Sequence, residues 1–126
     1  MHPTRHLVRI ALVLSALHGA AAAADELAAP GRKIFELRCQ GCHEGTSPSA
    51  FTLGPRLNGI IGRKVGSEST GVHSRAALES DTVWTRSSLR RFLSNPQRQM
   101  PGTLMTVDVP DPKDLDNLLN YLQTLK

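Results

Sequence analysis

The apolar residues of this chain recur at intervals of three and four positions in three separate stretches. This spacing places them on one face of a helix, and it therefore predicts three main helices. The stretches cover residues 29–38, 85–95 and 111–122. Neither repeats nor alternating strand patterns occur between them, so the sequence predicts an all-α protein.

The ends of these stretches carry local signals for helix boundaries. Pro30 fits the first turn of a helix, where its missing N–H costs nothing. Thr85 can cap the second helix, and Asn95 followed by Pro96 ends it. Asp111 precedes a proline and can cap the third helix. The three predicted helices thus have boundaries that agree with their apolar spacing.

Long segments without helical spacing separate these helices. Residues 44–71 are rich in Gly, Ser, Pro and Thr, and residues 97–109 are also irregular. Ser74 can cap a short helix that runs through Glu79. Loops of this length usually bind something or fold around it. Aromatic residues make up only 4% of the chain, so a small core of this kind would gain from a buried cofactor.

The N-terminus has a different composition from the rest of the chain. Arg5 and Arg9 give it a positive charge, an apolar stretch interrupted by one serine follows, and Ala20–Ala24 are small residues. This order is typical of a secretory signal peptide that is removed on export. We therefore predict a leader over residues 1–24 and a mature domain over residues 25–126. An uncleaved membrane anchor is disfavoured because the apolar stretch is short.

The net charge excludes one broad class of function. It is +4 for the full chain, and it falls to +2 when Arg5 and Arg9 leave with the leader. This charge is too mild for nucleic-acid binding, which usually requires a strong basic stripe. Basic residues gather in residues 86–98 and acidic residues in residues 108–116, which predicts two solvated helix faces.

The two cysteines lie three positions apart, in the run Cys39-Gln40-Gly41-Cys42-His43. Cys-x-x-Cys-His is the attachment signature of c-type haem. Its two thiols add to the two vinyl groups along one haem edge, and the histidine then lies beneath the iron. A thioredoxin-like redox pair needs βαβ units, which this sequence does not predict. A zinc site needs four well-placed ligands, and a histidine directly after Cys42 is poorly placed for one. The motif favours one covalent haem on Cys39 and Cys42, with His43 as an axial ligand.

One axial histidine leaves a second axial position on the iron, which methionine or histidine usually fills in electron-carrying haem proteins. Outside the predicted leader the candidates are His73, Met100 and Met105. Met100 precedes a proline, and a lone methionine is most often a core residue. Met105 follows Pro-Gly-Thr-Leu, an irregular segment that can bring the backbone close to a flat ring. The residues alone leave the three candidates open.

Taken in order, these segments resemble the class I c-type cytochromes of the mitochondrial and bacterial c2 type. The resemblance runs from Gly31 to Tyr121 and implies the small cytochrome c fold, with three main helices, short ones, and long loops wrapped around one covalent haem. The positions that carry it are Gly31, Phe35, Cys39, Cys42, His43, Gly54, Pro55, Leu57, Gly59, Gly62, Arg63, Lys64, Gly66, Trp84, Leu89, Phe92, Leu93, Asn95, Pro96, Pro101, Gly102, Thr103, Met105, Leu118 and Tyr121.

The resemblance also implies roles for individual residues. Met105 would be the second axial ligand of the iron, and its soft sulfur would raise the reduction potential. Pro55 would accept a hydrogen bond from the histidine ligand through its carbonyl. Arg63 and Trp84 would hold a haem propionate and offset the cost of burying its charge. Thr103 would also help to hold a propionate, from the side of the methionine ligand.

Three positions depart from the pattern of that family. Phe92 stands where a tyrosine often reaches the methionine sulfur, so its hydroxyl contact is lost. His73 replaces another tyrosine that often reaches a propionate, and an imidazole can serve there or titrate. Ala77 stands where an asparagine often supports a buried water. These substitutions keep the fold and leave the reduction potential open.

The predicted function is that of a soluble monohaem electron carrier and not of an enzyme. Two filled axial positions let the iron change its oxidation state without binding a substrate. Arginines and lysines around the haem edge are expected to steer an acidic partner. We expect a monomer that neither binds nucleic acid nor spans a membrane.

The predicted leader places this carrier in the periplasm. Its redox partners would then be a membrane oxidase, a bc1-type complex, a photosynthetic reaction centre or a periplasmic dehydrogenase. One alternative is a dedicated cytochrome subunit of a single periplasmic dehydrogenase. Another is a haem peroxidase or gas-binding protein, which the sequence favours only if Met105 does not ligate the iron.

Overall fold

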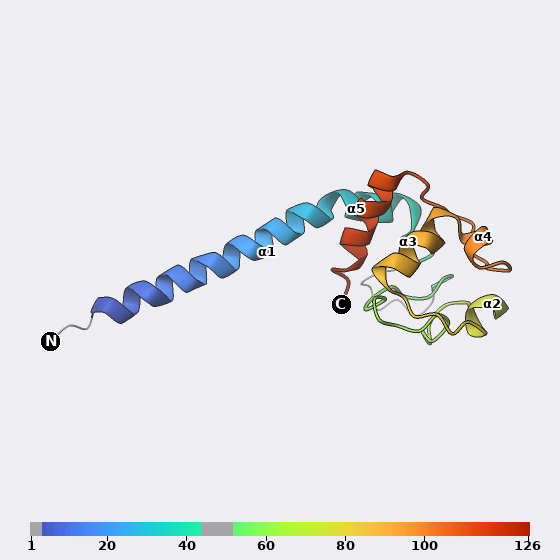
Figure 1. Ribbon diagram of the computed structural model, residues 1–126, viewed down its shortest axis with the longest axis horizontal. Helices are drawn as coiled ribbons and strands as arrows, with labels where there is room; N and C mark the ends of the chain where they lie inside the picture. Colours follow the sequence, from blue (N-terminus) through green and yellow to red (C-terminus); the bar gives the residue numbers. More distant parts are fainter. Residues whose placement is uncertain (1–3, 44–51) are drawn as a thin grey trace.

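The computed structural model describes residues 4–43 and 52–126, and it describes side chains from residue 19 onward. Part of the long loop predicted over residues 44–71 therefore lies outside the described residues. In the described part the chain forms helices and no β-strand, apart from an isolated antiparallel bridge between Lys64 and Val83. The helices are α1 (Thr4–Arg38), α2 (Arg75–Leu78), α3 (Arg86–Ser94), α4 (Pro96–Gln99) and α5 (Pro112–Leu122), as Figure 1 shows.

The first helix is much longer than its apolar spacing predicts. Helix α1 begins at Thr4, so the prediction of a helix that starts near residue 29 was wrong, and Pro30 lies inside the helix instead of in its first turn. The run of alanines before Pro30 has the highest helix propensity of any residue type and carries the helix through this region. Figure 1 shows that the N-terminal part of α1 projects away from the other helices.

The C-terminal part of α1 packs across α5, and this is the most extensive contact between helices. Gly31 lies against the backbone of Asn117 in α5, where no side chain would fit. Four residues later, the ring of Phe35 contacts that of Tyr121, with the ring centroids 5.3 Å apart. The glycine therefore brings the two helix axes close together, and the aromatic pair fills the space beside them.

The predicted helix caps are present at α2, α3 and α5. Ser74 accepts a hydrogen bond from the amide of Ala77, and Thr85 accepts one from the amide of Ser88. At α5 the carboxylate of Asp111 accepts from the amides of the second and third helical residues. Each cap satisfies an amide that lacks a partner within its own helix.

Helix α4 lies in a segment that was predicted to be irregular. Asn95 ends α3, as expected, and its side chain then accepts a hydrogen bond from the amide of Arg98. Pro96 occupies the first turn of α4, which suits its missing N–H. The Asn-Pro pair thus starts a helix as well as ending one, in the same way as the Asp-Pro pair does at α5.

The basic and acidic stretches do not form two separate solvated faces. Arg86 and Arg90 in α3 both form ion pairs with the carboxylate of Asp116 in α5. Arg86 also donates to the side chain of Gln123 beyond the end of α5. These contacts join α3 to α5, and the carboxylate of Asp116 neutralises part of the positive charge of α3.

The buried core lies where α1, α3 and α5 meet, and loop residues complete it. Leucines supply most of it, and Leu118 and Leu119 in α5 are almost completely buried. Its members are Ala28, Phe35, Cys39, Ile60, Leu89, Leu93, Val109, Leu115, Leu118, Leu119, Tyr121, Leu122 and Leu125. Because Cys39 belongs to this cluster, the helix core fixes the position of the cysteine motif.

We predict that Gly31→Ala lowers the free energy of unfolding by about 2 kcal/mol. A Cβ at this position would collide with the carbonyl of Asn117 and lie 2.8 Å from the Cβ of Tyr121. This overpacking outweighs the gain of about 1 kcal/mol that alanine brings to a helix. Guanidinium unfolding of the protein purified with its cofactor measures the change. Lys33→Ala, on the exposed side of α1, is the control, and equal stabilities of the two variants would contradict the prediction.

Candidate functional site

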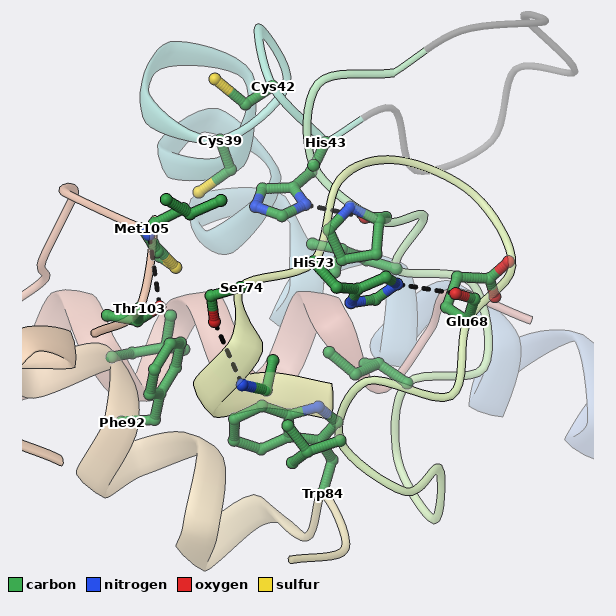
Figure 2. A pocket seen from close by; sticks show the side chains of 18 of the residues that line it. Cys39, Cys42, His43, Glu68, His73, Ser74, Trp84, Phe92, Thr103 and Met105 are labelled. Carbon is green, nitrogen blue, oxygen red and sulfur yellow. Dashed lines mark hydrogen bonds between the residues drawn. The ribbon is translucent and has the colours of Figure 1, made fainter. Parts of the chain in front are cut away.

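One cavity of about 450 Å³ brings all of the predicted site residues together. Side chains from α1, α3, α5 and the long loops line it, and Figure 2 shows the labelled ones around it. The predicted residues among them are Cys39, Cys42, His43, Pro55, Arg63, Trp84, Thr103 and Met105. Residues that are far apart in the sequence thus share one enclosure.

The cysteine motif forms a tight turn directly after α1. The amide of His43 donates to the carbonyl of Cys39 over 2.8 Å, which holds the turn closed. Cys39 is buried and its thiol faces the cavity, whereas Cys42 is exposed on the outside of the turn (Figure 2). Burial raises the pKa of the Cys39 thiol to about 11, against a smaller lowering by Arg38. This thiol is therefore protonated at neutral pH.

The ring of His43 is held in one orientation. Its Nδ1–H donates to the carbonyl of Pro55 over 2.7 Å, because a carbonyl can only accept. The other ring nitrogen, Nε2, therefore carries the lone pair and points into the cavity (Figure 2). Burial lowers the pKa of His43, with a partial compensation by the bond to Pro55, so the imidazole stays neutral and can act as a ligand.

Gly54 makes room for this ring. A Cβ at Gly54 would lie 2.7 Å from Nδ1 and 3.0 Å from Nε2 of His43, closer than van der Waals contact allows. Any side chain at this position would displace the imidazole from its hydrogen bond with the carbonyl of Pro55. The glycine of the Gly-Pro pair is thus required by the histidine, and the proline supplies its hydrogen-bond acceptor.

Met105 lies across the cavity from His43, and its sulfur points inward (Figure 2). The hydroxyl of Thr103 accepts a hydrogen bond from the amide of Met105 over 3.3 Å. The side chain of Gln97 in α4 donates to the carbonyls of Thr103 and Met105, over 3.1 and 2.9 Å. Gln97 was not predicted from the sequence, because its role depends on α4, which was predicted to be irregular.

The other two candidates for the second axial ligand also line the cavity. His73 uses Nε2 for a 2.6 Å hydrogen bond with the carbonyl of Glu68, which holds its ring away from the position facing His43. Met100 is the C-terminal cap of α4, where its amide donates to the carbonyl of Pro96. Of the side chains that Figure 2 labels, only Met105 presents a sulfur opposite the imidazole of His43.

Arg63 lines the cavity and binds the loop around it. Its guanidinium donates to the carbonyls of Arg56 and Asn58, the first over 2.6 Å, and it forms an ion pair with Glu68 at 3.3 Å. Partial burial opposes ionisation of Glu68, but Arg63 and the hydrogen bonds from Thr70 outweigh it and lower the pKa of this carboxyl. Glu68 was not predicted from the sequence, since no motif marks it.

The remaining wall is apolar. The rings of Trp84 and Phe92 pack together with their centroids 5.1 Å apart, and leucine, isoleucine and valine side chains complete the lining. A flat apolar group with carboxylates at one end fits this cavity. The two cysteines lie at the opposite end from Trp84, and an imidazole and a thioether face each other between them (Figure 2). This donor set suits a covalently attached haem.

Comparison with known proteins agrees with this site. The family model described as Cytochrome c matches residues 28–126. The chain is 34% identical over 97 residues to cytochrome c2 of Rhodoblastus acidophilus, covering 76% of this chain and 90% of that protein. It is 39% identical over 98 residues to cytochrome c2 of Agrobacterium tumefaciens, covering 75% and 87%. The structure of cytochrome cH from Methylobacterium extorquens superimposes with a TM-score of 0.66 at 34% identity, covering 77% of this chain and 97% of that one.

The fold and the site define a c-type cytochrome, and the chain belongs to the cytochrome c family. Membership confirms the predicted all-α cytochrome c fold and one covalent haem c, attached through Cys39 and Cys42. It also confirms the general function of a monohaem electron carrier. Within the described residues, none of the helices combines the length and the apolar character needed to cross a membrane.

We predict that Glu68→Gln destabilises the protein in a pH-dependent way. Because the pKa of Glu68 in the folded state lies below its ordinary value of 4.5, its ionised form stabilises the fold above that pH. This stabilisation is lost as the pH falls through the lower, folded-state pKa. At pH 7 the variant should therefore lose about 0.5–1 kcal/mol, after allowance for solvent screening, and the loss should shrink as the pH approaches 3.

Guanidinium unfolding across this pH range measures the difference. Glu79→Gln is the matched control, since Glu79 pairs with Arg75 at 2.7 Å with both side chains largely exposed. Its effect should be about 0.3 kcal/mol or less at every pH. An effect of Glu68→Gln that stays constant between pH 7 and 3 would show that the charge of this carboxylate is not the cause.

Proposed function

We propose that this protein is a periplasmic electron carrier whose haem iron is ligated by His43 and Met105. The observation that carries the ligand assignment is the placement of the two side chains on opposite sides of one cavity (Figure 2). The neutral imidazole offers a lone pair from Nε2, and the thioether offers a soft sulfur. Ligands on both sides keep substrates from the iron, which suits electron transfer and not catalysis.

The surrounding residues prepare the site for haem c, which supplies a one-electron ferrous–ferric couple when bound. Cys39 and Cys42 would each hold the haem through a thioether: the sulfur would bond to one vinyl carbon, the double bond would become single, and the thiol hydrogen would pass to the other vinyl carbon. The carbonyl of Pro55 holds the imidazole of His43 in one orientation, which would support ligation through Nε2. Thr103 and Gln97 brace the backbone of the methionine loop. These contacts support the proposal that His43 and Met105 are held in place as ligands.

Arg63, Trp84 and Thr103 are proposed to meet the haem propionates. Trp84 lies at the end of the cavity opposite Cys39, where the propionates of a haem tethered at the cysteines would lie, and Arg63 lines the same cavity. Arg63 is only partly available for this role, because two carbonyls and Glu68 already engage its guanidinium. His73 also lines the cavity and is a further candidate.

The periplasmic location rests on the leader proposed for residues 1–24. The match to the cytochrome c family begins only at residue 28, so the proposed leader lies outside the matched region. Bacterial cytochromes c2 are among the similar proteins, which supports an exported carrier. In that compartment the partners would be membrane respiratory or photosynthetic complexes, or a periplasmic dehydrogenase.

We expect the ferric protein to show the weak far-red absorption band of a methionine–iron bond, and Met105→Ala to abolish it. The band depends on the sulfur ligand, so its loss identifies the residue. The reduction potential of the variant should also fall, because the soft sulfur that favours ferrous iron is gone. Absorption spectra and potentiometric titration measure the two effects.

Met100→Leu is the control for this experiment, because it changes a second cavity-lining methionine while keeping its volume. The band should survive in this variant. If Met100→Leu abolishes the band and Met105→Ala retains it, the ligand assignment is wrong. A parent protein without the band would leave the second axial position to His73 or water, and peroxidase and gas-binding assays would then be the next measurements.

We expect the exported protein to begin at or near Asp25. Expression of the full chain in a bacterium that matures c-type haem should give a periplasmic protein that has lost about 24 residues. Mass spectrometry of the periplasmic fraction measures the cut. A double substitution of Ala22 and Ala24 by leucine should block cleavage without changing the domain. Recovery of haem-loaded protein with an intact N-terminus in the parent would contradict the proposed leader.

A further inference from the structure

The opening of the cavity is bordered by large apolar side chains that remain exposed. Leu53, Val72 and Leu104 all line the cavity, yet their exposures are 59%, 49% and 63%. A side chain that lines a cavity and is also half exposed lies at its opening. The amide of Val72 donates to the carbonyl of Leu53 over 2.9 Å, so two of the three lie on adjacent, hydrogen-bonded segments.

Among the described residues that line the same cavity, every arginine and lysine pairs with a carboxylate. Arg38 pairs with Asp108 at 3.9 Å, and Lys64 with Asp81 at 2.9 Å. The third, Arg63, pairs with Glu68, as described above. Each positive charge thus has a negative charge within 4 Å, and the pairs add little net charge to this part of the surface. The sequence led us to expect that basic side chains near the haem edge attract an acidic partner. Among the described cavity-lining residues, however, no arginine or lysine is unpaired.

This charge pattern decides what kind of surface can dock here. A partner must approach the cavity opening, because the rate of electron transfer falls steeply with distance from the cofactor. Long-range attraction requires a net charge on the docking face, and oppositely charged neighbours cancel each other's field beyond a few ångströms. Exposed apolar side chains around an opening, in contrast, gain free energy when a partner covers them.

We propose that Leu53, Val72 and Leu104 form the docking rim of this protein, and that its partner presents an apolar, charge-poor surface to it. Association is then driven by burial of a small apolar area, and the complex is transient, as is typical of small redox interfaces. The inference goes beyond the electron-carrier function and names the chemistry of the partner surface. It depends on the open edge of the cavity and not on which residue is the second axial ligand.

Electron exchange with coated gold electrodes tests the chemistry of the partner surface directly. One electrode carries a methyl-terminated monolayer and the other a carboxylate-terminated monolayer of equal chain length. We expect the haem-loaded parent protein to exchange electrons several-fold faster on the methyl surface, with less than a twofold change between 10 and 500 mM salt. Faster exchange on the carboxylate surface that collapses at high salt would overturn the proposal in favour of a basic docking face.

Variants of the rim identify the side chains responsible. The double variant Leu53→Gln/Val72→Thr keeps the side-chain size, and it should slow exchange on the methyl surface by roughly tenfold, since it removes two apolar contacts. Leu37→Gln is the matched control, because Leu37 is 76% exposed but does not line the cavity. Equal slowing by the control, or no slowing by the double variant, would show that this rim is not the docking surface.

A soluble oxidant tests the role of the paired charges. The rate of oxidation by the hexacyanoferrate(III) anion should change little with salt in the parent, because the local charges cancel. Asp108→Asn leaves Arg38 unpaired, and the same rate should then rise several-fold at low salt and return to the parent value at high salt. A steep salt dependence already present in the parent would contradict the cancellation.

The far-red band of the ferric protein is recorded for every variant. Its presence shows that the iron keeps its methionine ligand, so a change in exchange rate reports on docking alone. If the parent lacks the band, the ligand assignment made above fails while the electrode comparison still decides the docking proposal. The two proposals are therefore separable in one set of samples.

Discussion

The close crossing of α1 and α5 at Gly31 is the contact on which the rest of this structure depends. It places the end of α1 against a leucine-rich helix and so fixes the point at which Cys39 enters the core. From that point the chain has only one turn in which to present His43 to the cavity. A side chain at Gly31 would separate the helices and move the start of this turn, although Gly31 itself does not line the cavity.

The cavity itself is built mainly by loops, whose order comes from polar contacts more than from apolar burial. Pro55 orients the imidazole, Gln97 holds the methionine loop, and Arg63 ties several carbonyls together. Each of these contacts lies at the edge of a large apolar space. Ordering loops that lack regular hydrogen bonding costs conformational entropy. A covalent cofactor that fills the space therefore contributes to the stability of the fold as well as to the function.

The sequence predicts those features of the protein that depend on local chemistry. Caps such as Ser74 and Asp111 were correct, since each cap bonds to amides two or three residues away. The predicted start of α1 was wrong because the helix propensity of alanine extends the helix on the N-terminal side of Pro30. Helix α4 was not predicted because the Asn-Pro pair was interpreted only as the end of a helix. The roles of Glu68 and Gln97 could not be predicted, because they depend on how two loops fold back on the cavity.

Charge shows most clearly why composition is a poor guide to the surface of this protein. From the sequence, arginines and lysines around the haem edge are expected to steer an acidic partner. In the folded chain, Asp116 forms ion pairs with two arginines of α3. Asp108 pairs with Arg38, and Asp81 pairs with Lys64, beside the cavity. The large exposed side chains that line the cavity without such an ion pair, Leu53, Val72 and Leu104, are apolar. For an electron carrier this arrangement has a physical advantage, because a small apolar contact without strong ion pairs forms and dissociates quickly, and turnover requires both steps.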